Sequence, residues 1–222
     1  MQNVLIVGAS RGLGLEFVSQ YRAAGARVTA TARDDAGEQR IAELGARPLR
    51  LDVADAASAS GLAWQIDGER FDVVVVNAGV FGPRADALQT PTEADFDAVM
   101  RTNVLGPMRL LPQVADHLAD GARVALISSR MGSIGLRTGS SGWLYRASKA
   151  ALNSVMKDAS LALAAKATVI SFHPGWVRTD MGGSGADIDA PTSIAGMRTV
   201  LASVKPADTG SFFNYDGQRL DF

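Results

Sequence analysis

The stretch VGASRGLG, at residues 7–14, contains two overlapping patterns of residues that do chemistry. Gly8, Ser10 and Gly12 form a G-x-S-x-G, the turn that exposes a nucleophilic serine in hydrolases. Gly8, Gly12 and Gly14 form a spacing variant of the glycine loop that holds a dinucleotide pyrophosphate at a helix N-terminus. Both patterns lie between a strand-like run and a helical run, so this stretch alone allows acyl transfer or hydride transfer.

A second group of reactive residues is the stretch YRASK, which places Tyr145 and Lys149 four residues apart on one face of a helix. A phenol titrates near pH 10, and a nearby ammonium favours the phenolate and lowers that pKa. The pair therefore indicates a proton donor and acceptor. A serine hydroxyl at the end of the preceding strand, at Ser128 or Ser129, or at Ser133 just beyond it, is placed to hold a substrate oxygen.

The serine hydrolase reading of Ser10 requires an acid and a histidine later in the chain. His117 and His173 are the two histidines of the sequence, and they fall in separate elements without a supporting motif. The sequence has no cysteine, which excludes disulfides and thiol catalysis. We therefore favour the dinucleotide reading, in which Ser10 bonds a phosphate or the loop, and we expect no metal site.

Two arginines indicate which dinucleotide is bound. Arg33 follows the second strand-like run, where an arginine suits a ribose 2′-phosphate and an acid suits the free 2′-hydroxyl. Arg11, inside the glycine loop, is placed to reach the same phosphate. Asp34 is the conflicting residue, because its carboxylate could bind the ribose instead. The two arginines predict a preference for NADP(H) over NAD(H).

Further candidates follow other strand-like runs. Asn77, Ala78 and Gly79 come directly after VVVV, and their small size lets a flat ring approach the sheet edge. The stretch HPGWVRT breaks the chain after the sixth run at Pro174 and Gly175, and we expect His173 to pack there rather than to catalyse. Beyond it, the Val177 backbone and the Thr179 hydroxyl are placed to bond a carboxamide.

A helix predicted over residues 92–119 carries a polar residue, Asn103, on its apolar face. Pro107 has no N–H, so it leaves the Asn103 carbonyl without its helical donor and should bend the helix there. The freed carbonyl is suited to hold a water. The apolar stripe consists of Phe96, Val99, Met100, Val104, Met108, Leu111, Ala115 and Leu118.

These residues need a scaffold, and the chain alternates strand-like and helical runs. Strands are predicted at 4–7, 28–31, 48–51, 73–76, 124–127 and 169–172, and helices near 12–24, 35–44, 55–67, 92–119, 143–166 and 191–203. Continuous apolar runs are typical of strands buried on both faces of a parallel sheet. We predict one domain over residues 1–222, with a doubly wound, mainly parallel α/β sheet of about seven strands and helices on both faces.

Composition excludes several classes of function. The net charge of the 222-residue chain is −1 without a basic cluster, so a nucleic-acid partner is not expected. No apolar run approaches the roughly 20 residues that cross a bilayer, and the start of the chain does not read as a secretion signal. We expect a cytoplasmic protein without a membrane partner.

Taken together, GASRGLG, NAG, Asn103, SS, YRASK and PGWVRT resemble the short-chain dehydrogenase/reductase family, in the family's order over nearly the whole chain. The short length and the endings PGWVRTDMGG and YDG resemble its C-factor and sniffer-like carbonyl reductase branch. The resemblance implies a Rossmann fold and an NADP(H)-dependent oxidoreductase that interconverts a carbonyl compound and an alcohol. It also implies a homodimer or homotetramer formed through helices 92–119 and 143–166.

The resemblance further implies the role of each matching residue. Tyr145 is the general acid in reduction, Lys149 lowers its pKa and holds the nicotinamide ribose, Ser129 binds the substrate oxygen, and Asn103 supports a water relay. Ser129 lies 16 residues before Tyr145, a few more than is usual, but it keeps the family's spacing to Gly132. The implied coenzyme contacts are Gly8, Ser10, Arg11, Gly12, Leu13, Gly14, Arg33, Asp52, Val53, Asn77, Ala78, Gly79, Tyr145, Lys149, Pro174, Gly175, Val177 and Thr179.

Two functions stay open. An intact set of Ser129, Tyr145 and Lys149 favours a reductase of aldehydes or ketones. The C-factor resemblance instead allows a sensor or signalling protein that binds NADP with little turnover. Phe81, Met131, Trp143 and Trp176 are expected to make one pocket apolar, which fits many carbonyl compounds.

Overall fold

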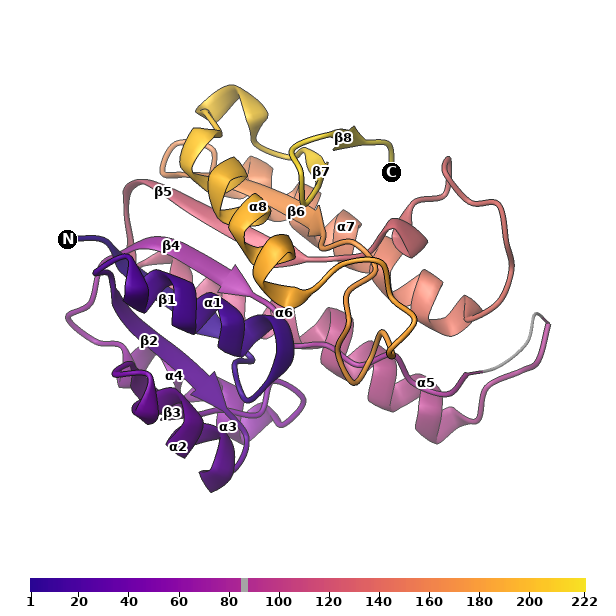
Figure 1. Ribbon diagram of the computed structural model, residues 1–222, viewed down its shortest axis with the longest axis horizontal. Coiled ribbons are helices and arrows are strands. Elements are labelled where there is room, and N and C mark those ends of the chain that lie inside the picture. Colours follow the sequence, from indigo (N-terminus) through magenta and orange to yellow (C-terminus); the bar gives the residue numbers. More distant parts are fainter. Residues whose placement is uncertain (85–87) are drawn as a thin grey trace.

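Eight strands form one sheet in the order β3-β2-β1-β4-β5-β6-β7-β8 in the computed structural model, which describes residues 1–84 and 88–222. The strands are β1 (Asn3–Val7), β2 (Arg27–Ala32), β3 (Arg47–Arg50), β4 (Phe71–Val76), β5 (Leu118–Ile127), β6 (Ala167–His173), β7 (Phe212–Asn214) and β8 (Arg219–Leu220). Strands β1 to β7 pair in parallel, and β8 pairs antiparallel with β7 at the edge. Figure 1 shows the sheet crossing the molecule.

The α-helices connect these strands. They are α1 (Gly12–Ala23), α2 (Asp35–Glu43), α3 (Ala56–Ser60), α4 (Leu62–Gln65), α5 (Glu93–Met100), α6 (Gly106–Ala115), α7 (Trp143–Ala162) and α8 (Ala190–Ser203). A π-helical turn, Arg101–Leu105, joins α5 to α6. Short 3₁₀ turns lie at Arg130–Gly132 and Pro206–Asp208.

Short polar side chains set several helix starts. Asp34 accepts a hydrogen bond from the Gly37 backbone N–H at 2.7 Å and so begins α2. Asp189 accepts from the Thr192 N–H at 2.8 Å and begins α8. Such caps satisfy backbone donors that the first helical turn leaves unpaired.

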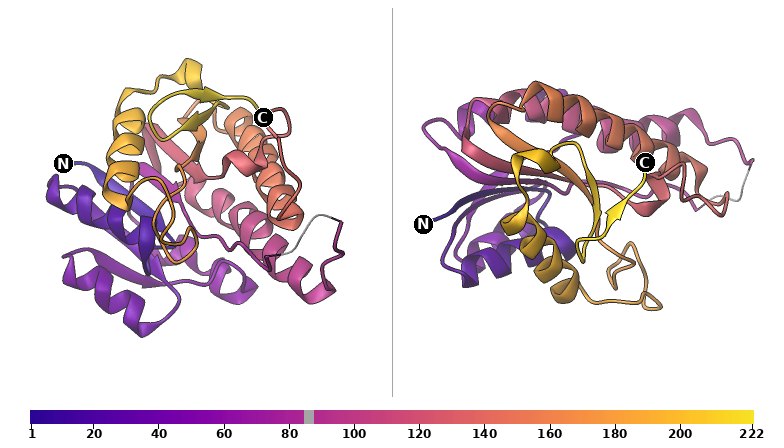
Figure 2. Two further views of the ribbon diagram at one scale, coloured as in Figure 1. Left: turned by 45° about the vertical axis from the view of Figure 1, so that its right-hand side comes forward. Right: turned by 90° about the horizontal axis from the view of Figure 1, so that it is seen from above.

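Alternate residues of each central strand face opposite layers of helices. In β1, Val4 and Ile6 pack with α1, α2 and α8, whereas Leu5 and Val7 pack with α3, α4, α6 and α7. Figure 2, seen from above, shows the two helical layers on either side of the sheet. The strands read as continuous apolar runs because both faces are buried.

The predicted fold class is confirmed, with differences in its details. The sheet has eight strands rather than about seven, because a short antiparallel strand follows β7. The predicted helix 55–67 is two short helices, and α7 ends at Ala162. None of the helices in the described residues has the length and hydropathy of a membrane span.

The predicted helix 92–119 is wrong in extent and in one part of its apolar stripe. It is divided by the π-helical turn and ends at Ala115, and Leu118 already belongs to β5. Phe96 is 48% exposed and Met108 is 50% exposed, because the turn rotates the flanking helices relative to one ideal stripe. The irregularity itself lies where Pro107 predicts it.

Candidate active site

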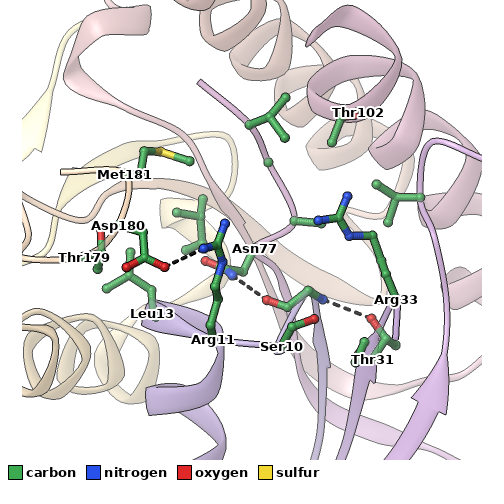
Figure 3. Close-up of a pocket in the computed structure, with 18 of the residues that line it drawn as sticks. Ser10, Arg11, Leu13, Thr31, Arg33, Asn77, Thr102, Thr179, Asp180 and Met181 are labelled. Carbon is green, nitrogen blue, oxygen red and sulfur yellow. Dashed lines mark hydrogen bonds and ion pairs between the residues drawn. The ribbon is translucent and has the colours of Figure 1, made fainter. Parts of the chain in front are cut away.

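A cavity of about 230 Å³ opens at the carboxyl ends of the parallel strands. It spans the point between β1 and β4 where the strand order reverses, which is the usual ligand position in such sheets. Figure 3 shows part of its lining. The lining residues are Gly8, Ser10, Arg11, Gly12, Leu13, Thr31, Ala32, Arg33, Leu51, Asp52, Val53, Asn77, Ala78, Gly79, Val80, Thr102, Ile127, Ser128, Tyr145, Lys149, Pro174, Thr179, Asp180 and Met181.

The glycine loop is fixed by contacts between three strand ends. Gly8 has φ +87°, and a Cβ there would lie 2.7 Å from the Ala78 backbone. The Gly8 N–H donates to Thr31 Oγ1 at 3.0 Å, and the Asn77 side-chain amide donates to the Gly8 carbonyl at 2.7 Å (Figure 3). A Cβ on Gly14 would lie 2.1 Å from that same carbonyl, so only glycine lets α1 start this close to the turn.

The N-terminus of α1 faces this cavity with its backbone donors open. Arg11 occupies the cap position, makes no side-chain cap hydrogen bond, and is followed by no acid in the first turn. Free N–H groups and the helix dipole together favour an anion. The loop therefore fits a pyrophosphate.

Ser10 has no hydrolase partners in the cavity. His117 precedes β5 at the amino ends of the strands, opposite the cavity, and its carbonyl accepts from the Phe71 N–H at the start of β4. His173 ends β6 outside the cavity lining, and burial lowers its pKa to about 4. Neither histidine supports a nucleophilic Ser10.

The residues after β2 and β3 form one end of the cavity. Arg33 lines it, whereas the Asp34 carboxylate caps α2, which removes the conflict that Asp34 posed in the sequence. Arg40 donates through Nε to the Ser10 carbonyl at 2.8 Å, so a further cation supports the glycine loop from behind. Asp52 accepts from the Ala54 N–H at 2.9 Å and lines the cavity beside Val53.

The Arg11 side chain pairs with Asp180 on another wall of the cavity. Its Nη1 lies 2.5 Å from Oδ2 of Asp180, which belongs to the loop between β6 and α8 (Figure 3). Sequence reasoning missed Asp180, although it directly follows Thr179. Its partner is 169 residues away, and no local pattern links the two.

Tyr145 and Lys149 lie in the first two turns of α7, and both side chains are buried. Lys149 Nζ donates to the Ile127 carbonyl at 2.8 Å and lies 5.7 Å from the centre of the Tyr145 ring. Burial lowers the pKa of Lys149 to about 8 and raises the pKa of Tyr145 to about 12. The expected lowering of the tyrosine pKa by Lys149 is therefore wrong for this geometry, because burial of the phenol outweighs other influences.

Among the three serines considered, Ser129 is the one that lowers the Tyr145 pKa, and its Oγ also accepts from the Met131 N–H at 3.1 Å. A hydrogen bond from the Ser129 side chain opposes the effect of burial on the Tyr145 pKa. The Ser128 hydroxyl lines the cavity but points to the Lys149 carbonyl at 3.4 Å, and Ser133 Oγ accepts from the Leu136 N–H at 3.0 Å. The geometry thus favours Ser129 over its two neighbours.

Asn103 lies in the π-helical turn and is fully buried. Its side-chain amide donates to the Val80 carbonyl at 2.8 Å and to Ser148 Oγ at 3.0 Å, and its Oδ1 accepts from the Val80 N–H at 2.8 Å. The side chain therefore ties the turn to the segment after β4 and to α7. It does not line the cavity.

An aromatic stack covers Tyr145. The Phe81 ring lies 4.5 Å from the Tyr145 ring at an interplanar angle of 23°. Met131 and Phe81 both approach Gly142, with side-chain atoms 3.3 and 3.4 Å from where a Cβ would stand. These two residues form the apolar wall expected beside the phenol.

The two tryptophans expected in that apolar pocket both donate their indole N–H to a backbone carbonyl. Trp143 Nε1 donates to the Gln89 carbonyl at 2.9 Å. Trp176 is 52% exposed, and its Nε1 donates to the Gly182 carbonyl.

The loop after β6 closes the other end of the cavity. Pro174 and Thr179 line it, whereas Val177 is buried and pairs with Ile188 in an isolated bridge. Gly175 has φ +84°, and a Cβ there would lie 2.5 Å from Ile188. Val177 and Gly175 therefore shape this loop, and neither residue lines the cavity.

The structure brings most predicted site residues into one cavity. Five are outside its lining, namely Gly14, Asn103, Ser129, Gly175 and Val177. Besides Asp180, the sequence missed Thr31, Ala32, Leu51, Val80, Thr102, Ile127 and Met181, which adjoin predicted residues or follow strands. Within residues 1–84 and 88–222, no three His, Cys, Asp or Glu side chains gather as a metal site.

Comparisons with known proteins agree with this geometry. A family model described as short chain dehydrogenase matches residues 2–187. The C-signal protein of Myxococcus xanthus is 42% identical over 152 residues, which cover 67% of this chain and 91% of that protein.

Two solved structures superimpose over the whole chain. A short-chain dehydrogenase/reductase from Burkholderia multivorans with bound NADP has a TM-score of 0.91 and 31% identity, and the match covers 100% of this chain and 99% of the other. The carbonyl reductase Sniffer of D. melanogaster has a TM-score of 0.89 and 29% identity, with 100% of both chains covered.

Proposed function

The chain belongs to the short-chain dehydrogenase family, and from this premise we propose that it is an NADP(H)-dependent oxidoreductase that interconverts an aldehyde or ketone and the corresponding alcohol. The observation that carries the proposal is one cavity that joins the glycine loop to the buried pair Tyr145 and Lys149. When bound, the nicotinamide coenzyme supplies or accepts the hydride.

The residues that line the cavity fit such a coenzyme. The open N-terminus of α1, with Gly8, Ser10, Gly12 and Leu13, suits the pyrophosphate. Arg33 and Arg11 suit a 2′-phosphate, since planar guanidinium groups bind phosphate through paired hydrogen bonds. Further contacts are assigned to Asp52 and Val53 for adenine, Asn77, Ala78 and Gly79 along the cavity floor, Lys149 for the ribose, and Pro174, Gly175, Val177 and Thr179 for the carboxamide.

Tyr145 acts as the general acid when a carbonyl compound is reduced. Its pKa of about 12 keeps the phenol protonated at neutral pH, so a proton is available for the carbonyl oxygen. Ser129, bonded to the same phenol, positions that oxygen beside the proton. In alcohol oxidation the phenolate takes the proton back, and the Ser129 hydroxyl, which lowers the Tyr145 pKa, stabilises that anion.

Asn103 supports the return of the proton to Tyr145 from solvent. Pro107 lacks an N–H, so the Asn103 carbonyl lacks its ordinary helical donor and suits a relay water. The three side-chain hydrogen bonds of Asn103 hold the π-helical turn in place for this role.

The substrate is a carbonyl compound with an apolar group near the reacting carbon. Phe81 and Met131 lie beside Tyr145 and provide the apolar contact. The relationship to a structure named as a carbonyl reductase supports the same class.

The proposal is tested by measuring NADPH oxidation with a panel of aromatic and aliphatic aldehydes and ketones. We expect turnover with several of them, and a fall in kcat of about 10²–10⁴ for Y145F, which removes the phenol hydroxyl and leaves the ring. Y21F is the matched control, because Tyr21 is buried in α1 outside the cavity lining. Retention of most of kcat by Y145F would refute the mechanism.

A second candidate is an NADP-binding sensor or signalling protein with little turnover. It is favoured by the 42% identity to the C-signal protein, whose name describes signalling. Tight NADPH binding without oxidation across the whole carbonyl panel would select this candidate over the reductase.

We also propose a homodimer or homotetramer that forms through the α5–α6 segment and α7. Phe96, Leu105 and Met108 are 48%, 38% and 50% exposed along that segment, which is unusual for large apolar side chains. Light scattering coupled to size exclusion should give two or four times the 23.2 kDa chain mass. A single chain mass at micromolar concentration would refute this assembly.

A further inference from the structure

The ion pair between Arg11 and Asp180 joins two walls of the coenzyme cavity. Arg11 directly precedes α1, whereas Asp180 lies in the loop between β6 and α8, and both residues line the cavity. Their closest side-chain atoms are 2.5 Å apart. Figure 3 shows this pair on one side of Ser10 and the guanidinium of Arg33 on the other.

The Asp180 carboxylate, which pairs with Arg11, resembles the coenzyme 2′-phosphate that we assign to Arg11. A carboxylate and a phosphate are both anionic oxygen acceptors, and both bind the same donors of a guanidinium. One guanidinium that faces Asp180 is turned away from the ribose end of the cavity, where Arg33 lies. A bound 2′-phosphate must therefore share Arg11 with Asp180 or displace Asp180 from it.

We propose that Asp180 is a specificity-determining residue, which weakens the preference for NADP(H) over NAD(H) by competing with the 2′-phosphate for Arg11. The inference rests on the proposed function, because it takes the coenzyme assigned there. The inference adds Asp180, whose side chain opposes the preference for NADP(H). Asp180 lies in the same loop as Thr179.

The exposure of the pair sets the size of the effect. The Arg11 and Asp180 side chains are 70% and 73% exposed, and exposed ion pairs are weak because water and salt screen them. A dianionic phosphate with charge-assisted hydrogen bonds is a stronger partner. The pair therefore yields to NADPH at a cost of about fivefold in Kd, which corresponds to about 1 kcal/mol. NADH has no 2′-phosphate and leaves the pair intact.

The experiment measures Kd for NADPH and for NADH by calorimetry on the parent protein, D180N and D187N. We expect D180N to lower the Kd for NADPH by about fivefold and to leave the Kd for NADH within about twofold. D187N is the matched control, because Asp187 lies in the same loop, is exposed, and forms no ion pair within the described residues. It should leave both constants within about twofold.

A second pair of variants tests whether the effect passes through Arg11. In an R11A background, D180N should no longer lower the Kd for NADPH, because the guanidinium for which Asp180 and the phosphate compete is absent. The inference is overturned if D180N changes both coenzymes equally, if D187N has the same effect, or if the effect persists without Arg11.

The Kd values of the parent protein also test the proposed preference for NADPH over NADH. Equal constants for NADPH and NADH in the parent protein would refute that preference, whatever D180N does. The competition at Arg11 would still require D180N to lower the Kd for NADPH and not the Kd for NADH. If D180N did not do this, the inference would be refuted.

Discussion

The Lys149 ammonium donates a hydrogen bond to the backbone carbonyl of Ile127 at 2.8 Å, at the buried carboxyl end of β5. One carbonyl does not replace the hydration of a cation, so burial lowers the Lys149 pKa to about 8. One turn earlier on α7, burial raises the pKa of Tyr145 to about 12. The interior thus favours the neutral form of both groups.

This relationship predicts how stability changes with pH. The pKa of Lys149 falls from its ordinary value of 10.5 in the unfolded chain to about 8 in the folded protein, so its contribution to stability is present above pH 10.5 and is lost as pH falls to 8. The free energy of unfolding should therefore rise between these values by on the order of 3 kcal/mol from this group. Tyr145 and Tyr21 act in the opposite direction from pH 10 to 12, because folding raises both pKa values to about 12.

The Lys149 contribution is isolated by urea unfolding of the parent protein and K149M at intervals from pH 7 to 10. The stability of the parent relative to K149M should be constant below pH 8 and should increase above it. K157M is the control, since Lys157 is exposed on the same helix and should give a constant difference. A constant difference for K149M as well would contradict the buried cation.

Arg33 should supply most of the coenzyme preference. It lines the cavity, and within residues 1–84 and 88–222 no acid forms an ion pair with it. Loss of one charge-assisted phosphate contact costs about 1.5–3 kcal/mol, so R33A should weaken NADPH binding by about 10- to 100-fold. NADH binding should change less than about twofold. R70A is the control and should alter neither Kd, because Arg70 precedes β4 at the amino ends of the strands, away from the cavity.

The sequence predicts the glycine loop and the Tyr145–Lys149 pair because their contacts are local or lie at strand ends. The turn at Gly8 and the helix face of α7 follow from residues within a few positions of one another. Parallel topology then brings the ends of β1, β2, β4, β5 and β6 to one edge, as the apolar runs indicate.

Other features depend on tertiary contacts that spacing does not encode. The period of an apolar stripe is the same whether it faces the core or the solvent, so the exposure of Phe96 and Met108 was not predictable. The pairing of Arg11 with Asp180 joins two distant loops. The pKa of Tyr145 depends on the depth of its burial, which only the packed structure shows.

Gly14 should be essential for coenzyme binding. The Cβ of alanine would lie 2.1 Å from the Gly8 carbonyl and 2.8 Å from the Ala9 Cα, so G14A must move the start of α1 away from the turn. We expect a loss of NADPH binding of at least about 100-fold, with a lower melting temperature, because the N–H groups no longer converge. G61A is the matched control, since a Cβ on Gly61 would lie no closer than 3.7 Å to Gln65 Nε2. Unchanged binding by G14A would rule out this loop as the phosphate site.

Two buried asparagines should respond oppositely to replacement. Asn103 makes three side-chain hydrogen bonds, and N103A removes the partners of the half-buried Val80 N–H and carbonyl and one of the two partners of the Ser148 hydroxyl. We expect a loss of about 3 kcal/mol, or about 6–12 °C in Tm. The Asn153 amide is buried on α7 and has no hydrogen-bond partner in the described residues, so N153L should be neutral or stabilising. Equal losses in thermal unfolding of the two variants would contradict these assignments.

Phe81 should control the protonation of Tyr145 through the ring stack. The rings lie 4.5 Å apart, so F81L removes a flat apolar cover and admits water to the phenol. We expect the Tyr145 pKa to fall from about 12 towards 10, by on the order of one unit. Ultraviolet titration near the phenolate band measures this shift, and the double variant F81L/Y145F identifies which transition belongs to Tyr145. An unshifted transition in F81L would show that the backbone around α7, rather than the Phe81 ring, keeps water from the phenol.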